Sequence, residues 1–160
     1  MHLLAEFSIV IEKPPAVVFA FAADLARFGQ WFPGVVAIHA EDTSPPAAMG
    51  KRYRETVTLP LGGRREIDIV VVDADPGRRL VTEGEFPPLL PRMEMRFDPA
   101  GSGDATLFDW RMYSRGATLR AAAMRVPARA LMQGRAEAGL AKLKALLEAE
   151  WAAAPHGQAS

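Results

Sequence analysis

The sequence of 160 residues contains no cysteine. This absence excludes disulfide bonds, thiolate metal sites, a cysteine nucleophile and cysteine-ligated iron–sulfur clusters. The sequence also lacks an excess of charge of either sign, because Lys plus Arg and Asp plus Glu both number 19. No net electrostatic field therefore draws the chain toward nucleic acid or an anionic membrane, and we expect no nucleic-acid partner.

Long apolar runs are missing as well. No stretch of about 18 consecutive apolar residues occurs, so we expect no membrane span. The N-terminal segment reaches Glu6 too early for the apolar region of a signal peptide, so the expected location is the cytoplasm. The three histidines, His2, His39 and His156, are far apart in the sequence. They form no recognisable metal or triad set, and we expect neither a metal nor a cofactor.

The most regular stretch is residues 118–151, which has the spacing of one long amphipathic helix. Pro127 either begins this helix or kinks it, and Thr118 is a suitable N-cap. Such a helix buries its apolar stripe only against a matching apolar surface, which the preceding chain must supply. The length suits one domain, residues 1–151, followed by a frayed tail at 152–160. The apolar stripe comprises Met124, Ala128, Met132, Ala136, Leu140, Leu143, Leu147 and Trp151.

The rest of the chain reads mainly as strands. Residues 15–28 keep helical spacing after a proline that is suited to a first helical position, and Gly29 ends this predicted helix. Residues 86–91 are interrupted by prolines and are predicted to form a loop that exposes Leu89 and Leu90. Alternation of apolar and polar residues predicts strands at residues 4–12, 35–41, 51–59, 64–73, 80–85, 92–97 and 105–114.

Several motifs mark the ends of these elements. They are Lys13-Pro14-Pro15 with Val18 and Asp24, Trp31-Phe32-Pro33-Gly34-Val35, Gly50, Asp75-Pro76-Gly77-Arg78-Arg79-Leu80, and Gly101-Ser102-Gly103 before Thr106. Their order and spacing resemble the polyketide cyclase/dehydrase branch of the START-like (SRPBCC) superfamily over nearly the whole domain. The resemblance implies the α+β helix-grip fold, a curved seven-stranded antiparallel sheet wrapped around the long C-terminal helix. It also implies a deep cavity between the concave face of the sheet and that helix.

Strand parity predicts which residues line this cavity. The same apolar residues could form an ordinary core, but the methionines favour a ligand site because flexible thioethers adapt to varied apolar molecules. Trp31, Phe32 and the loop at residues 86–91 could form an apolar gate over the cavity entrance, or Trp31 could instead anchor the first helix on the sheet. The predicted ligand-binding residues are Trp31, Tyr53, Glu55, Ile69, Glu83, Met93, Met95, Phe108, Trp110, Met112, Met124 and Met132.

Two carboxylates, Glu55 and Glu83, fall on the predicted apolar face, where an unpaired charge is costly. Glu55 beside Tyr53 could act as a catalytic acid/base pair, with the pKa of the carboxyl raised by burial. The alternatives are a position at a strand end that reaches solvent, or a register shift by one residue that turns Glu55 outward.

These observations leave three functions open. The leading hypothesis is cofactor-free binding of a small hydrophobic or aromatic molecule, similar to a lipid or a polyketide. The second is a polyketide cyclase or dehydratase that uses Glu55 and Tyr53. The third is a protein-interaction module that uses the outer face or the loop with Pro87 and Pro88, and exposed Leu89 and Leu90 would also suit a homodimer contact.

Overall fold

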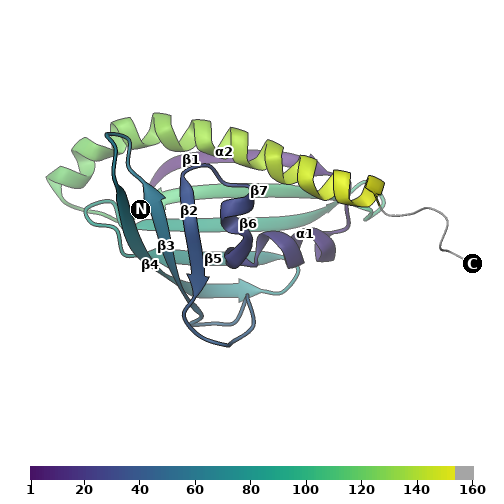
Figure 1. Ribbon diagram of the computed structural model, residues 1–160. Helices are drawn as coiled ribbons and strands as arrows, with labels where there is room; N and C mark the ends of the chain where they lie inside the picture. Colours follow the sequence, from purple (N-terminus) through teal and green to yellow (C-terminus); the bar gives the residue numbers. More distant parts are fainter. Residues whose placement is uncertain (154–160) are drawn as a thin grey trace, which may run out of the picture.

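A computed structural model describes residues 1–153 of the chain, and the side chains of residues 1–149. The strands form one antiparallel sheet in the order β1-β7-β6-β5-β4-β3-β2, and the helix α2 lies along one face of this sheet (Figure 1). This arrangement confirms the predicted α+β helix-grip fold. The elements are β1 (His2–Ile11), α1 (Pro15–Ala22), the 3-10 helix η1 (Leu25–Gln30), β2 (Val35–Ala40), β3 (Arg52–Thr58), β4 (Arg64–Asp75), β5 (Arg79–Gly84), β6 (Pro91–Ala100), β7 (Ala105–Ser114) and α2 (Leu119–Ala153).

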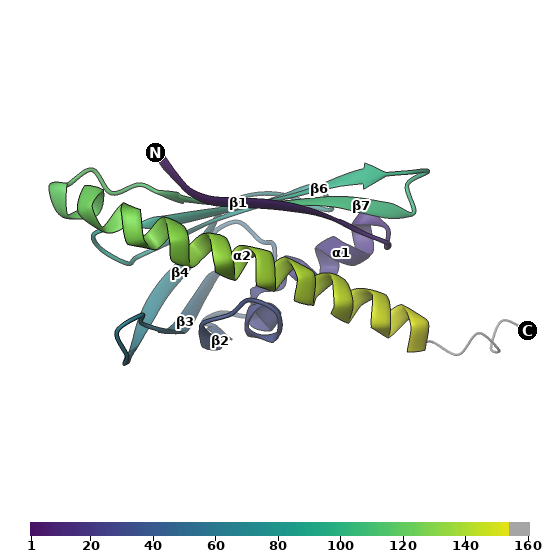
Figure 2. The same cartoon turned by 90° about the horizontal axis from the view of Figure 1, so that it is seen from above.

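The sheet bends around α2. Figures 1 and 2 show β6 and β7 running along the helix, whereas β3 and β4 cross it steeply. The helix begins as predicted, because the Thr118 hydroxyl accepts a hydrogen bond from the Ala121 amide at 3.1 Å. Pro127 lies inside the helix and not in its first turn. Within the described residues, no helix is long and apolar enough to cross a membrane.

The second half of α2 carries the predicted apolar stripe. Ala136, Leu140, Leu143 and Leu147 are all buried against the sheet. The predicted end of the stripe at Trp151 lies outside the residues whose side chains are described. The predicted tail began at residue 152, whereas α2 extends to Ala153, and residues 154–160 lie outside the described residues.

Side chains of α2 also bond to the backbone of the edge strand β1 and the residue that follows it. The Gln133 amide nitrogen donates to the Glu6 carbonyl at 3.0 Å, and the Gln133 amide oxygen accepts from the Glu6 amide at 3.3 Å. Further along, Lys144 donates to the Val10 carbonyl at 2.7 Å, and Glu148 accepts from the Glu12 amide at 3.0 Å. The helix is therefore fastened along the outer edge of the sheet.

The predicted single helix at residues 15–28 is wrong, because the structure divides it. Helix α1 ends at Ala22, and the Asp24 carboxylate then accepts a hydrogen bond from the Ala26 amide at 3.2 Å, which starts η1. An aspartate at an N-cap favours a new helical start over continuation of the preceding helix. The break lets η1 turn its aromatic residues into the concave face of the sheet.

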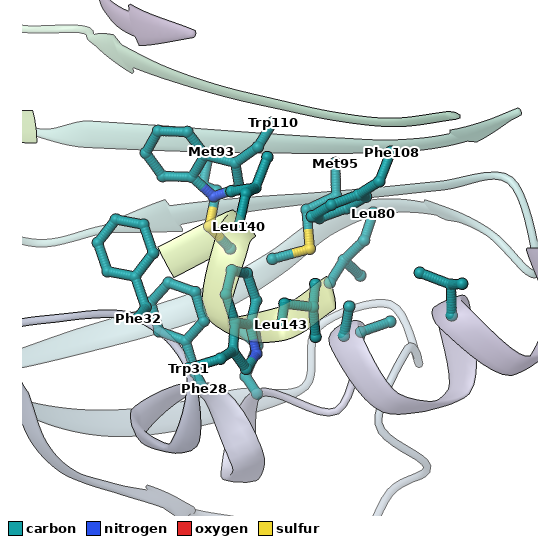
Figure 3. Close-up of a cluster of buried hydrophobic side chains, with 14 of the residues drawn as sticks. Phe28, Trp31, Phe32, Leu80, Met93, Met95, Phe108, Trp110, Leu140 and Leu143 are labelled. Carbon is teal, nitrogen blue, oxygen red and sulfur yellow. The ribbon is translucent and has the colours of Figure 1, made fainter. Parts of the chain in front are cut away.

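An aromatic cluster fills one half of that concave face (Figure 3). Phe28 and Phe32 stack with ring centroids 4.8 Å apart, and Phe32 reaches Trp110 of β7 at 5.1 Å. Trp31 and Trp110 are almost completely buried, and Leu140 and Leu143 of α2 complete this part of the core. The half of the sheet under α1, η1 and the second half of α2 is therefore densely packed.

The loop at residues 86–91 differs from its prediction. Leu89 is buried, because the Gly116 amide and the Ser114 hydroxyl both donate to its carbonyl and hold the loop on the sheet. Leu90 is half-buried, and Pro91 begins β6 opposite Ser114. The expectation that Leu89 is exposed is thus wrong, and the loop offers less apolar surface to a partner than the sequence suggested.

Candidate ligand-binding site

A cavity of about 330 Å³ lies between the sheet and the first half of α2. This volume is in the lower range of small-molecule sites, which span roughly 300–1,000 Å³. The floor comes from β3 to β7, and the roof comes from α2. Its principal lining residues are Phe28, Phe32, Glu55, Val57, Ile67, Ile69, Thr82, Gly84, Met93, Met112, Met124, Leu131, Met132 and Arg135.

The cavity lies over the half of the concave face on which α2 is the main covering element. Helices α1 and η1 occupy the other half of that face, and small residues such as Gly84 and Ala128 leave room here. The predicted ligand-binding residues consequently divide into two sets. Those that line the cavity are Glu55, Ile69, Met93, Met112, Met124 and Met132.

The other predicted residues lie elsewhere. Four of them lie on the same side of the sheet but belong to the packed aromatic half, so they do not line the cavity. These are Trp31, Met95, Phe108 and Trp110. Strand alternation places Met95, Phe108 and Trp110 on the inner face correctly, but it does not reveal which part of that face a helix covers. The predicted gate at Trp31 is likewise wrong, because this side chain is only 1% exposed.

Tyr53 is buried but lies outside the cavity lining. Its hydroxyl donates to the Pro46 carbonyl at 3.1 Å, on the side of the connection between β2 and β3. Burial raises the pKa of this phenol, and the charge of Asp24 acts in the same direction. The structure therefore does not bring Tyr53 and Glu55 together in the cavity as the predicted pair.

Glu83 faces the outer side of the sheet, so its predicted place on the inner face is wrong. The inner residues of β5 are Leu80, Thr82 and Gly84, which pair with inner residues of β4 and β6. Glu83 instead forms ion pairs with Arg92 at 3.0 Å and Arg115 at 3.2 Å.

Glu55 is the acidic residue that the sheet carries into the cavity. It lies in the middle of β3 between Ile38 of β2 and Ile67 of β4, and it is 7% exposed. Burial among apolar neighbours raises the pKa of its carboxyl to about 7, and the positive charge of Arg135 opposes this effect. Glu55 can therefore be either neutral or ionised near neutral pH.

Arg135 reaches the cavity from α2, and the sequence interpretation missed it. Burial lowers the pKa of its guanidinium, while the charge of Glu55 raises it. The guanidinium lies against Gly34, where a Cβ atom would be 2.5 Å from the Arg135 Cζ. Its signal in the sequence was its position three residues after Met132, on the cavity side of the helix.

The cavity contains few polar side chains, and the charges of two of them, Glu55 and Arg135, act on each other. Within the described part of the chain, no side-chain hydrogen bond or ion pair is formed by Glu55, Thr82 or Arg135. A carboxyl, a hydroxyl and a guanidinium thus remain available inside an otherwise apolar chamber. This combination suits a mainly apolar molecule that carries one or two oxygen atoms.

Comparisons with known proteins agree with this architecture. The aromatase/cyclase Zhui from Streptomyces sp. R1128 is 17% identical, with a TM-score of 0.74 and coverage of 94% of this chain and 96% of that one. TTHA0849 from Thermus thermophilus is 18% identical, with a TM-score of 0.68 and coverage of 91% and 97%. StfQ, a di-domain aromatase/cyclase of the steffimycin pathway, is 17% identical with a TM-score of 0.68, and the match covers 94% of this chain and 52% of that one.

These structural likenesses establish the fold. None of the curated proteins matches the chain in sequence. A family model described as polyketide cyclase / dehydrase and lipid transport, in contrast, matches residues 3–148, from the start of β1 to the second half of α2. With the sheet, the long helix and the cavity all inside this match, the chain belongs to the polyketide cyclase / dehydrase and lipid transport family.

Proposed function

We propose that the protein binds a small, mainly apolar molecule in the cavity, with Glu55 and Arg135 holding the polar end of that molecule. The observation that carries this proposal is a buried carboxyl and a partly buried guanidinium that lack hydrogen-bond partners among the described residues, inside a chamber lined by methionine and aliphatic side chains. Burying such groups without partners is costly, and a bound ligand would recover that cost.

The two polar groups would discriminate between ligands. Arg135 offers only hydrogen-bond donors, so it would face a carbonyl, phenolate or carboxylate oxygen of the ligand. Neutral Glu55 offers one donor and one acceptor, so it would suit a hydroxyl or a second carbonyl. Met93, Met112 and Met132 would adapt to the apolar body.

Binding can be tested in two steps. Native mass spectrometry of the freshly purified protein would show a co-purified molecule as a mass that is lost on denaturation. Titration with 2-naphthol, an aromatic probe with one hydroxyl, would then measure occupancy of the empty cavity by calorimetry. We expect saturable binding of one probe molecule per chain, and a lack of saturable binding of any aromatic or aliphatic probe would contradict the proposal.

Matched variants locate the probe. Ile69→Trp would fill the cavity, whereas Val70→Trp places the same side chain on the opposite face of β4. We expect the first to abolish 2-naphthol binding and the second to retain it. Arg135→Met, which keeps an unbranched side chain of similar length but removes the charge, should weaken binding about tenfold or more, because a hydrogen bond to a charged group is worth roughly 1.5–3 kcal/mol.

A second function, that of a cyclase or dehydratase, is favoured by one observation. The pKa of Glu55 at about 7 suits a general acid/base that works near neutral pH. In this case Glu55 would remove a proton from a carbon next to a ligand carbonyl. A direct assay is exchange of such hydrogens for deuterium in a 1,3-diketone, followed by NMR. Catalysed exchange that falls about 100-fold or more in Glu55→Gln would favour the enzyme, and unchanged exchange would refute this role.

A further inference from the structure

The first half of α2 is apolar on both of its faces. Its inner face lines the cavity through residues such as Met124 and Met132, as described above. Its outer face presents Leu119, Ala123, Val126 and Ala130, which follow helical spacing and are all exposed to solvent. Leu119 is 90% exposed and Val126 is 69% exposed. The solvent side of a surface helix normally carries polar residues, so this apolar stripe lacks its expected cover.

A second apolar tip lies at the same end of the molecule as this stripe. Figure 1 shows the hairpin between β3 and β4 rising to the level of the first half of α2, and Figure 2 shows a gap between the hairpin tip and the helix. Leu61 at its tip is fully exposed, and the neighbouring Leu59 and Pro60 line the cavity together with Met124 of the helix. The exposed leucine, the outer stripe and one end of the cavity therefore belong to the same end of the molecule.

The charges at this end are positive, although the chain as a whole is neutral. Between Asp109 and Glu137 the sequence contains six arginines and no other charged residue. Two of them, Arg111 and Arg115, form ion pairs with carboxylates, and Arg135 lines the cavity, so the positive charges at the surface of α2 come from Arg120, Arg125 and Arg129. The charge of Arg125 and, to a smaller extent, that of Arg129 lower the pKa of the exposed His2. At the hairpin, Arg64 is exposed and Arg65 lies over the Phe86 ring at 5.0 Å.

The positive charge of this surface favours an anionic partner over a second copy of the chain. In a two-fold dimer through the outer stripe, Arg120 and Arg125 of one copy would face the arginines of the other copy, and the like charges would repel. The stripe therefore favours an anionic, apolar surface. An interfacial helix with an apolar face bordered by arginines is the arrangement that inserts into the headgroup region of an anionic bilayer.

We propose that the outer stripe of α2 and the tip of the β3–β4 hairpin dock on the surface of an anionic lipid bilayer, with one end of the cavity beside the acyl chains. Leu61, Leu119 and Val126 enter the apolar boundary, and Arg64 and Arg120 lie among the phosphates. An apolar ligand could then move between bilayer and cavity without crossing water. The proposal rests on surface residues, so it stands or falls separately from what the cavity holds.

The test is co-sedimentation of the intact protein with vesicles. We expect binding to vesicles of equal parts phosphatidylglycerol and phosphatidylcholine, little binding to pure phosphatidylcholine, and loss of binding when the salt concentration is raised. Because one arginine near an anionic surface contributes about fivefold to partitioning, Arg64→Gln combined with Arg120→Gln should lower the partition coefficient about 25-fold. Arg78→Gln combined with Arg96→Gln, two exposed arginines outside the docking surface, should leave it unchanged.

A second pair of variants tests the contribution of the apolar residues to vesicle binding. Val126→Glu should lower partitioning about tenfold or more, whereas Ala145→Glu, on an exposed position of the second half of α2, should have little effect. Both changes introduce glutamate, which is a good helix former, and an unchanged urea unfolding curve would report that the domain is intact. The proposal is overturned if anionic vesicles do not retain the protein, or if Val126→Glu and Ala145→Glu behave alike. Retention on an acidic polypeptide without retention on vesicles would point instead to an acidic protein partner.

Discussion

The buried Glu55 carboxyl makes the stability of the protein depend on pH in a predictable direction. Its pKa is raised from 4.5 to about 7 in the folded protein, so between these values the folded state binds more protons than the unfolded state. The contribution of this residue to stability is therefore greatest below pH 4.5, falls as the pH rises through this window, and is lost above pH 7. Since each pH unit corresponds to about 1.4 kcal/mol, ionised Glu55 costs about 3 kcal/mol relative to an unshifted glutamate.

The variant Glu55→Gln isolates this cost, because glutamine keeps the size of the protonated side chain and does not ionise. We expect the two proteins to have similar free energies of unfolding near pH 4.5, and the variant to be more stable by about 3 kcal/mol near pH 8. Urea unfolding followed by the fluorescence of buried Trp31 and Trp110 measures both values. Taking the difference between the proteins at each pH cancels the titration of all other groups.

The outer-face residue Glu83 provides the control, because it forms ion pairs and is not enclosed in the cavity. Glu83→Gln should not gain stability as the pH rises. If the difference between wild type and Glu55→Gln stayed constant from pH 4.5 to 8, then Glu55 would not be a desolvated carboxyl. The electrostatic reasoning behind both proposed functions would fail with it.

Three further changes have defined consequences for urea unfolding or probe binding. Leu143→Ala should cost about 2–5 kcal/mol because this side chain is fully buried, whereas Leu146→Ala on the exposed side should cost little. Thr118→Ala should cost about 1 kcal/mol through loss of the helix cap, which Thr118→Ser should largely restore. Gly34→Ala should cost about 1–2 kcal/mol because of its φ of +87°, and it should weaken 2-naphthol binding by displacing Arg135, so unchanged binding would contradict that contact.

The sequence predicted the fold because the two periodicities are clear. In residues 105–114 the apolar residues Phe108, Trp110 and Met112 alternate with the charged residues Asp109 and Arg111, and the predicted strand coincides with β7. The helical stripe from Ala136 to Leu147 was equally regular. The break at Asp24 was missed because apolar residues on its two sides keep a common helical spacing, so that only the side chain of Asp24 signals the new start.

The cavity was harder to predict because it depends on what covers the sheet. Met93 and Met95 alternate on the same strand and face the same side, yet one lines the cavity and the other is buried under the packed half. Glu83 was misplaced because both alternating sets of the short strand β5 contain apolar residues, so its parity is ambiguous. Arg135 was overlooked because a charged residue on a helix usually faces water.

The fastening of α2 to β1 has a consequence for the behaviour of the protein in concentrated solution. An open strand edge can recruit another chain into a growing sheet and begin aggregation. Here the bonds from Gln133 and Lys144 occupy backbone groups of β1 that would otherwise be free to pair. Local detachment of the helix, well short of complete unfolding, would uncover that edge. The rate of aggregation during storage should therefore depend on the free energy of local detachment of α2 more closely than on the overall melting temperature.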